Sequence, residues 1–362
     1  MAEPRNAHPY HLYDAIQAQP AAIARVLASR NIIAEAGKAA AEKKRVTFAG
    51  IGTSLHAALV AQFWMRYLTR GRALAHADQP FELVHHPAAF DRDDAVAVIT
   101  HTGTTTYSIE ALRLARAAGA LTIAITGFTS GKDIAGADFH LETCEQEASF
   151  AYTKSYTAAL AAIALLILSM AERRKLLADA GAFRALEHVP SLMKESLELE
   201  PQAREFARRA AALPRMNLFG SGACWATARE AALKIKESCY MAAEGFETEE
   251  ILHGPFSELD SRGTIVGLLT GNAGDDRARR ILRAAGELKM LRAAVTVASA
   301  NRDISAEHVF VIPETPEWLA AFVHLVPLQL LTYFMALERG LNPDSGRQDQ
   351  PVHAAAAKHY KY

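Results

Sequence analysis

The feature that most constrains the fold is a repeated rhythm in which a short β-branched or apolar run is followed by a longer alanine-rich stretch with helical periodicity. Short runs of this kind indicate strands, and strands that alternate with helices favour a parallel α/β sheet. The rhythm follows a helix expected over residues 13–29. Expected strands in the first half of the chain are 45–51 (RVTFAGI), 95–101 (AVAVITH), 121–126 (LTIAIT) and 139–143 (FHLET). Expected strands in the second half are 216–219 (MNLF), 264–270 (TIVGLLT), 293–298 (AAVTVA) and 309–312 (VFVI).

The two halves have the pattern of an internal duplication, with a polar, strandless stretch between them. We therefore expect two similar α/β domains joined by a helical connection. The expected boundaries are 1–30 for an N-terminal helical segment, 31–176 and 215–345 for the two domains, 177–214 for the connection and 346–362 for a C-terminal tail.

Charge and cysteine content exclude several classes of function. Lys plus Arg (39) nearly balances Asp plus Glu (40), so no overall field favours nucleic acid or an anionic membrane. The three cysteines are far apart and odd in number, which indicates a reduced, cytoplasmic protein. The longest apolar run, 158–171, is too short to cross about 30 Å of hydrocarbon and predicts a buried core helix. The pair His85-His86 has no partner at metal-ligand spacing, so no metal is expected.

Three expected strands end in turns rich in small residues: GIGTS (50–54), THTGTTT (100–106) and GSGAC (220–224). In an open parallel sheet ligands bind beyond the carboxyl ends of the strands, where helix N-termini attract anions. Thr100, Thr102 and Thr105 are spaced to surround one phosphate, with Ser54 reaching from the neighbouring turn. The alternative is that these hydroxyls only cap the following helices. Two hydroxyl-rich turns in the first half favour one phosphate site there, and the absence of nucleotide-binding glycine motifs disfavours a nucleotide.

Acids, amines and a histidine gather between residues 229 and 255. The stretch 228–241 has helical spacing, so Glu230, Lys234 and Glu237 share one face. A solvated salt-bridge ladder would explain this face without any catalysis. However, the following turn Leu-His-Gly-Pro presents His253, and a helix carboxylate with a loop histidine suits proton transfer between sugar carbons and ring opening. An amine that forms an imine with a ketose would come from the C-terminal lysines Lys358 or Lys361.

These motifs resemble the sugar isomerase (SIS) family, and most closely the isomerase half of glucosamine-6-phosphate synthase. The resemblance rests on GIGTS, ITHTGTTTYS, EASFAYTKSYT, EAALKIKESCYMAAE with ILHGP, and VPLQLLTYFMALERGLNPD, in that order and spacing. It implies two SIS domains, each a five-stranded parallel sheet flanked by helices in a flavodoxin-like αβα sandwich, with a sugar phosphate bound between them.

The resemblance also implies roles for individual residues. Glu237 matches the base that moves a proton between C1 and C2, with Lys234 supporting it. His253 matches the ring-opening histidine, which is contributed across the interface of a homodimer. The substrate-binding positions are Ser54, Thr100, His101, Thr102 and Thr105 for the phosphate, and Phe150 and Tyr152 for the sugar.

The sequence departs from the family at the phosphate loop and the tail. In ITHTGTTT, His101 replaces an amide side chain and Thr104 stands where a glutamate is usual. In the tail, GRQDQPVHAAAAKHYKY, the imine-lysine position is assigned to Lys358, with His353 and Lys361 as alternatives because the spacing from Pro351 is long.

The expected function is therefore that of a phosphosugar aldose-ketose isomerase or deaminase without a cofactor. Its substrate would be an amino sugar phosphate or a related ketose phosphate of the glucosamine-6-phosphate or fructose-6-phosphate type. The chain shows no N-terminal nucleophilic cysteine or glutaminase half, so glutamine-dependent synthesis is not expected. The alternatives are a fructosamine-6-phosphate deglycase, a non-catalytic sugar-phosphate-binding regulator, and an amidotransferase subunit fed by a separate glutaminase.

Overall fold

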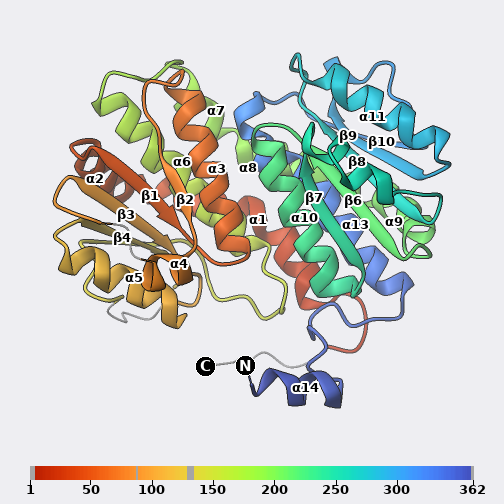
Figure 1. Cartoon of the computed structure of the whole chain (residues 1–362), viewed down its shortest axis with the longest axis horizontal. Helices are drawn as coiled ribbons and strands as arrows, with labels where there is room; N and C mark the ends of the chain where they lie inside the picture. The colour runs from red at the N-terminus through yellow and green to blue at the C-terminus, as the bar shows by residue number, and fades with distance from the viewer. Residues whose placement is uncertain (1–4, 87–88, 129–133, 360–362) are drawn as a thin grey trace. The chain divides into compact units, whose positions relative to one another are not determined.

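The computed structural model describes residues 5–86, 89–128 and 134–359 and divides into two compact units, each built on one parallel sheet (Figure 1). One unit contains residues 19–146 and 154–190. The other contains the described parts of 1–18 and 191–362, together with the segment 147–153. The expected connection 177–214 is helical, with α7 (Ala182–Glu187), α8 (Val189–Leu197) and α9 (Glu200–Ala210).

The first sheet has five parallel strands in the order β2-β1-β3-β4-β5. Helices α2 (Arg30–Ala41), α3 (Thr53–Leu68) and α6 (Lys154–Arg173) pack together on one face, and α4 (Pro80–His85) and α5 (Thr106–Ala117) pack on the other. The strands are β1 (Arg45–Ala49), β2 (His76–Asp78), β3 (Asp94–Ile99), β4 (Leu121–Thr126) and β5 (Phe139–Glu142).

Helix α6 contains the long apolar run and is buried along almost its whole length, as the sequence predicts for a core helix. Two segments, Lys154–Arg173 and Glu317–Glu338, are long and apolar enough to cross a membrane, and both are almost wholly covered by the rest of the protein. Buried apolar helices of this kind are typical of the cores of large α/β domains.

The second sheet repeats the topology of the first, with five parallel strands in the order β10-β9-β8-β6-β7. Helices α10 (Ala223–Cys239) and α13 (Leu325–Glu338) lie on one face, and α11 (Asp275–Glu287) on the other. The strands are β6 (Arg215–Gly220), β7 (Ala242–Glu247), β8 (Gly263–Leu269), β9 (Leu291–Val297) and β10 (His308–Ile312).

The predicted fold class is confirmed, and all eight expected strands are present. Two further strands were not expected from the sequence: β2 lies at an edge of the first sheet and β7 at an edge of the second. Strand β2 has only three residues, and β7, AAEGFE, alternates acids with small residues where a strand usually carries β-branched ones. Both strands are stabilised by pairing with a more central strand, β1 for β2 and β6 for β7. The sequence of a short segment does not predict such pairing.

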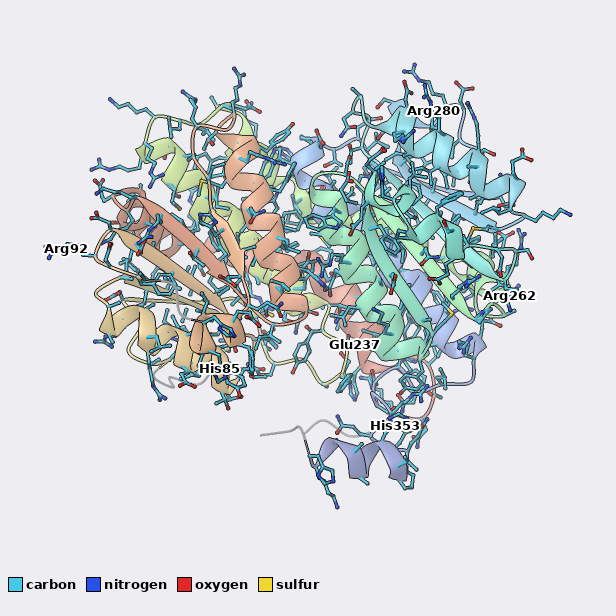
Figure 2. The ribbon with its side chains drawn as sticks, viewed as in Figure 1. His85, Arg92, Glu237, Arg262, Arg280 and His353 are labelled. Atoms are coloured by element: carbon cyan, nitrogen blue, oxygen red, sulfur yellow. The ribbon has the colours of Figure 1, made fainter. Side chains whose placement is uncertain are left out.

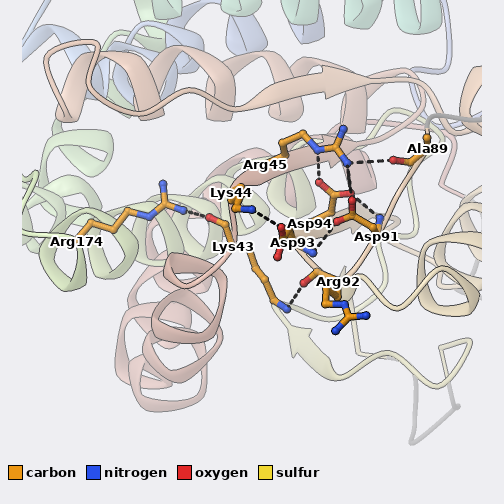
Figure 3. Close-up of polar contacts among 9 residues, drawn as sticks. All are labelled: Lys43, Lys44, Arg45, Ala89, Asp91, Arg92, Asp93, Asp94 and Arg174. Atoms are coloured by element: carbon orange, nitrogen blue, oxygen red, sulfur yellow. Dashed lines mark hydrogen bonds and ion pairs between the residues drawn. The ribbon is translucent and has the colours of Figure 1, made fainter.

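Charged residues fix the register at the amino ends of β1 and β3 (Figure 3). The Arg45 guanidinium makes two hydrogen bonds to the buried Asp94 carboxylate, with Nε at 2.5 Å from Oδ1 and Nη2 at 2.7 Å from Oδ2. Because this pair is bidentate, it resists a slip between the strands. The register that this pair sets at the amino ends of β1 and β3 also determines which residues lie side by side at their carboxyl ends, where the turns begin.

Asp344, two residues before the C-terminal tail, links the end of the chain to its start. Its carboxylate accepts hydrogen bonds from the backbone N–H groups of His11, at 2.9 Å, and Leu12, at 2.8 Å, in the first turn of α1 (His11–Ala28). A carboxylate at a helix start satisfies donors that the helix itself leaves free.

We predict that Asp344→Asn lowers the stability of the protein by about 2 kcal/mol, because one charged acceptor is replaced by an amide that faces two donors. The measurement is the midpoint of urea unfolding. Asp349→Asn, an exposed change in the same segment, is the matched control and should leave the midpoint unchanged. Equal midpoints for the two variants would show that Asp344 does not hold the tail.

Candidate active site

The threonine loop of the first sheet, residues 100–105, lies where the winding of that sheet reverses. Strands β1 and β3 are neighbours, and their following helices, α3 and α5, pack on opposite faces. The carboxyl ends of two such strands form the usual ligand crevice of an open α/β sheet. The residues that the sequence predicts for the phosphate, including Ser54 in the first turn of α3, thus follow the carboxyl ends of these two neighbouring strands.

Hydroxyls in the threonine loop bond to one another rather than capping α5. Thr100 is buried, and its Oγ1 donates to Oγ1 of Thr105 at 3.4 Å, while Oγ1 of Thr104 donates to Oγ1 of Thr102 at 3.0 Å. Thr105 occupies the N-cap position of α5 but makes no capping hydrogen bond with its side chain. This arrangement disfavours the alternative that these threonines serve only as helix caps.

The base of the threonine loop is anchored by the backbone of His101. Its carbonyl accepts hydrogen bonds from Gly127 N–H at 2.8 Å and from the Gln146 side-chain amide at 3.0 Å. Gln146 was not singled out in the sequence, because a lone glutamine carries no signal. The Gln146 side chain holds the loop in place through the backbone carbonyl of His101.

The equivalent loop of the second sheet is already filled by a carboxylate of the protein. Thr270 follows β8 as Thr100 follows β3, and Asp275 lies five residues later, at the position equivalent to Thr105. Asp275 is buried and accepts hydrogen bonds from the N–H groups of Thr270, at 3.2 Å, and Gly271, at 2.8 Å. Burial raises the pKa of Asp275. These contacts leave the threonine loop of the first sheet as the better anion site.

A row of three charged side chains lies along α10. Lys234 is only 2% exposed, and its Nζ lies 2.6 Å from Oε2 of Glu237 and 3.5 Å from Oε1 of the fully buried Glu230. Burial alone would lower the pKa of Lys234, but the carboxylates of Glu230, Glu237 and Glu147 outweigh it and raise that pKa. The amine is therefore held as an ammonium.

The burial of this charged row decides between the two interpretations of the sequence. A solvated salt-bridge ladder would leave all three side chains in water, whereas here only Glu237 reaches solvent, with 22% of its side chain exposed. The ladder interpretation is therefore wrong. One carboxylate at the end of a buried charged row is a suitable acceptor for a substrate proton.

The segment 147–153 brings further groups toward this row. Glu147 accepts the N–H of Thr153 at 3.0 Å, and Phe150 donates its N–H to the Asp344 carbonyl at 3.1 Å. Burial raises the pKa of Tyr152, and the charges of Glu147 and Glu237 add to this effect while Lys234 opposes it. Glu147 was missed in the sequence, although it is the first residue of the EASFAYTKSYT motif.

A cavity of about 360 Å³, called here the catalytic cavity, opens beside Glu237. Figure 2 shows Glu237 near the end of α10 and His353 on α14 (Pro351–Ala357). Among the tail alternatives, His353 lines this cavity, Lys358 follows α14 without lining it, and Lys361 lies outside the described residues. The lining residues are Phe150, Lys236, Glu237, Tyr240, Met241, Gly346, Arg347 and His353.

His253 lies apart from the catalytic cavity of its own chain. It is 72% exposed, on the corner between η1 (Glu250–Leu252) and η2 (Pro255–Glu258), and its Nε2 is 3.2 Å from Oε1 of Glu249. The Glu249 carboxylate also binds Arg277 at 2.7 Å, and these two partners lower its pKa to about 2. The histidine is thus presented outward on a fixed corner.

Comparisons with known proteins show what the chain resembles in sequence. The sequence profile of the SIS domain matches residues 40–169. The chain is 30% identical over 358 residues to glutamine–fructose-6-phosphate aminotransferase (isomerizing) of Thermococcus kodakarensis, covering 96% of this chain and 58% of that protein. The chain spans little more than half the length of the curated relatives it matches.

Solved structures share the fold. The C-terminal domain of glucosamine-fructose-6-phosphate aminotransferase from Francisella tularensis superposes with a TM-score of 0.87 at 20% identity, covering 94% of this chain and 99% of that one. Glucosamine-6-phosphate deaminase from Thermotoga maritima gives 0.74 at 19% identity, with 92% and 97% covered.

We predict that Lys234→Met destabilises the protein by about 3 to 5 kcal/mol, because it leaves two carboxylates without their buried counter-charge. Adding Glu230→Gln to that variant should recover part of the lost stability, because it removes one of the two carboxylate charges that have lost their counter-charge. Urea unfolding measures both effects. Lys236→Met, an exposed change two residues away, is the control, and equal losses for Lys234→Met and Lys236→Met would contradict a buried charged row.

Proposed function

The chain belongs to the SIS domain family, and on that premise we propose that it is a sugar-phosphate isomerase in which Glu237 moves a proton between C1 and C2 of the substrate. The observation that carries the proposal is the buried row of Glu230, Lys234 and Glu237, which ends in a carboxylate at the wall of a cavity. Buried, paired charges seldom add stability, so their presence beside a cavity favours a catalytic use.

The proposed reaction is a 1,2-proton shift. Glu237 takes the proton from C2 of an aldose, which leaves an enediol or, for a 2-amino sugar, an enolamine. It then returns the proton to C1 while a proton moves to O1 from O2, or from the C2 nitrogen of an amino sugar, and the same steps run in reverse for a ketose. The Lys234 ammonium compensates the negative charge that builds up on the reacting atoms.

Lys234 does not supply the imine amine in this proposal. An imine requires a neutral amine, and the three neighbouring carboxylates raise the pKa of Lys234. The imine is assigned to Lys358, which the family resemblance implies, with His353 as the tail residue that already lines the catalytic cavity.

Ring opening is assigned to His253 of a second copy of the chain. Within its own chain this histidine is held by Glu249 and lies outside the lining of the catalytic cavity. The proposal therefore includes a homodimer in which each subunit offers its exposed corner to the other.

The phosphate of the substrate is assigned to the threonine loop, with Ser54. Hydroxyls and helix N-termini at the reversal point of a sheet bind phosphate, and among the described residues no carboxylate is hydrogen-bonded to this loop as Asp275 is to its counterpart. Because the relatives are named for fructose 6-phosphate and a neighbour for glucosamine 6-phosphate, we propose a substrate of that class.

We predict that Glu237→Gln lowers kcat at least about a thousandfold while KM changes less than about threefold, because the amide keeps the shape of the side chain but cannot accept the proton. Conversion of glucosamine 6-phosphate and water to fructose 6-phosphate and ammonia, followed by NMR, is the assay. Glu287→Gln, an exposed change on α11, is the control. An active Glu237→Gln enzyme would remove Glu237 from the role.

We predict that Thr105→Asp abolishes the thermal stabilisation given by a sugar phosphate, because it places a carboxylate where Asp275 stands in the second sheet. Thr105→Val, which removes only the hydroxyl, should weaken binding roughly tenfold. The unphosphorylated sugar serves as the control ligand. Unchanged stabilisation in Thr105→Asp would place the phosphate elsewhere.

A further inference from the structure

The solvent-facing side of α11 carries a hollow of about 250 Å³, which we call the arginine hollow. Its walls come from α11 and from the segment that follows η3 (Ala298–Ala300). Helix α11 packs on the face of the second sheet opposite α10, so the hollow is separate from the catalytic cavity. The lining residues are Asp276, Arg279, Arg280, Arg283, Arg302 and Asp303.

The two walls of the arginine hollow are joined by the side chain of Arg279, which is only 11% exposed. Its Nε donates to the Arg302 carbonyl at 3.0 Å, and its Nη2 donates to the Ala300 carbonyl at 3.1 Å. Its Nη1 binds Oδ1 of Asp276 at 3.0 Å. One guanidinium thus ties the helix to the facing segment, and the hollow is a built feature of this surface.

The other three arginines of the hollow keep their donors for a ligand. Arg280, Arg283 and Arg302 are exposed, and within the part of the chain that the structure describes their guanidiniums make no hydrogen bond or ion pair. By contrast, Arg277 on the same helix binds Glu249 at 2.7 Å. A guanidinium presents five N–H donors in a planar fork that matches the oxygens of a phosphate.

The equivalent helix of the first sheet shows that this charge is not required by the fold. With the two loops aligned as above, Arg280 corresponds to Glu110 of α5, and Arg283 corresponds to Arg113. The pair in α5 therefore has opposite charges at i and i+3, as is usual on a solvated helix face, whereas the pair in α11 has two like charges that repel. An anion bound between them would remove this repulsion.

The charge of the arginine hollow suits one phosphoryl group. Asp276 is already paired with Arg279, which leaves three guanidiniums and the carboxylate of Asp303, a net charge of about two positive. A phosphoryl group carries about two negative charges at neutral pH. The hollow is also larger than a phosphate ion, so it has room for a small organic group beside it.

We propose that the arginine hollow binds the phosphoryl group of a small ligand, whether inorganic phosphate or a phosphate monoester. Arg280 and Arg283 contact it from α11, where Figure 2 shows Arg280, and Arg302 contacts it from the facing segment. This inference goes beyond the proposed function, because a ligand on this face of the sheet lies opposite Glu237 and is not the reacting sugar.

The test is calorimetry at low ionic strength with inorganic phosphate and with glycerol 3-phosphate as probes. It compares the wild-type chain with Arg280→Gln/Arg283→Gln and with Arg302→Gln, which alters the opposite wall. The charge-matched control is Arg113→Gln/Arg209→Gln, two exposed arginines on α5 and α9. The threonine loop is unchanged in all four proteins, so it contributes equally to each titration.

We expect the wild-type chain and the control to show a binding event that weakens at least about tenfold in Arg280→Gln/Arg283→Gln and in Arg302→Gln. Tighter binding of glycerol 3-phosphate than of inorganic phosphate would identify a phosphorylated metabolite as the source of the phosphoryl group. Equal titrations in all four proteins, or the same loss in the control, would overturn the proposal. Arginine-dependent binding of an acidic peptide but of neither probe would also overturn it, since the surface would then dock a protein.

A second readout separates this site from the catalytic one. Because the hollow and Glu237 belong to opposite faces of the sheet, Arg280→Gln/Arg283→Gln should turn over glucosamine 6-phosphate at the wild-type rate. Lost turnover with unchanged probe binding would overturn the proposal. If the wild-type chain itself shows no turnover, the proposed function fails, and the titrations still decide whether the arginine hollow binds a phosphoryl group.

Discussion

The site depends on one interaction, the buried ammonium of Lys234 between the carboxylates of Glu230 and Glu237. Removing a charge from water costs free energy that close counter-charges offset. Loss of any one of the three charged groups would therefore leave a buried charge without its partner and destabilise the protein. Because the three lie at i, i+4 and i+7 on one face of α10, the helix itself sets their distances. At one end of the row the Glu237 carboxylate is partly exposed at the catalytic cavity, and the buried Lys234 ammonium holds it in position.

The duplicated fold gives the physical reason for which we propose a phosphate site in the first half. Both sheets reverse their winding between a first and a third strand, and both place a loop and a long helix there. In the second sheet the buried Asp275 accepts the loop N–H groups, whereas the first sheet has Thr105 at that position. The side chain at this one position thus distinguishes the two loops, and we propose an anion only for the loop that has the threonine. The second sheet instead carries α10 and its charged row.

Regular elements were predictable from the sequence because β-branched runs and helical spacing are local signals, and Lys234 with Glu237 was predictable because both lie on one helix. Strand β7 was not, since its acids and glycine become a strand only by pairing with β6. The effect of Glu147 on Lys234 and the stacking of Arg347 on Tyr240 also escaped prediction. They arise where segments distant in sequence, 147–153, α10 and the tail, are brought together by the fold.

The most direct test of the central claim is incorporation of deuterium from heavy water into the sugar carbons of glucosamine 6-phosphate or fructose 6-phosphate, followed by NMR with the wild-type protein. We expect deuterium at C2 of the aldose or C1 of the ketose, because a carboxylate that carries the substrate proton exchanges it with solvent over repeated turnovers. Tight binding of a sugar phosphate with no deuterium at either carbon would contradict it and would favour a protein that senses the sugar without transforming it.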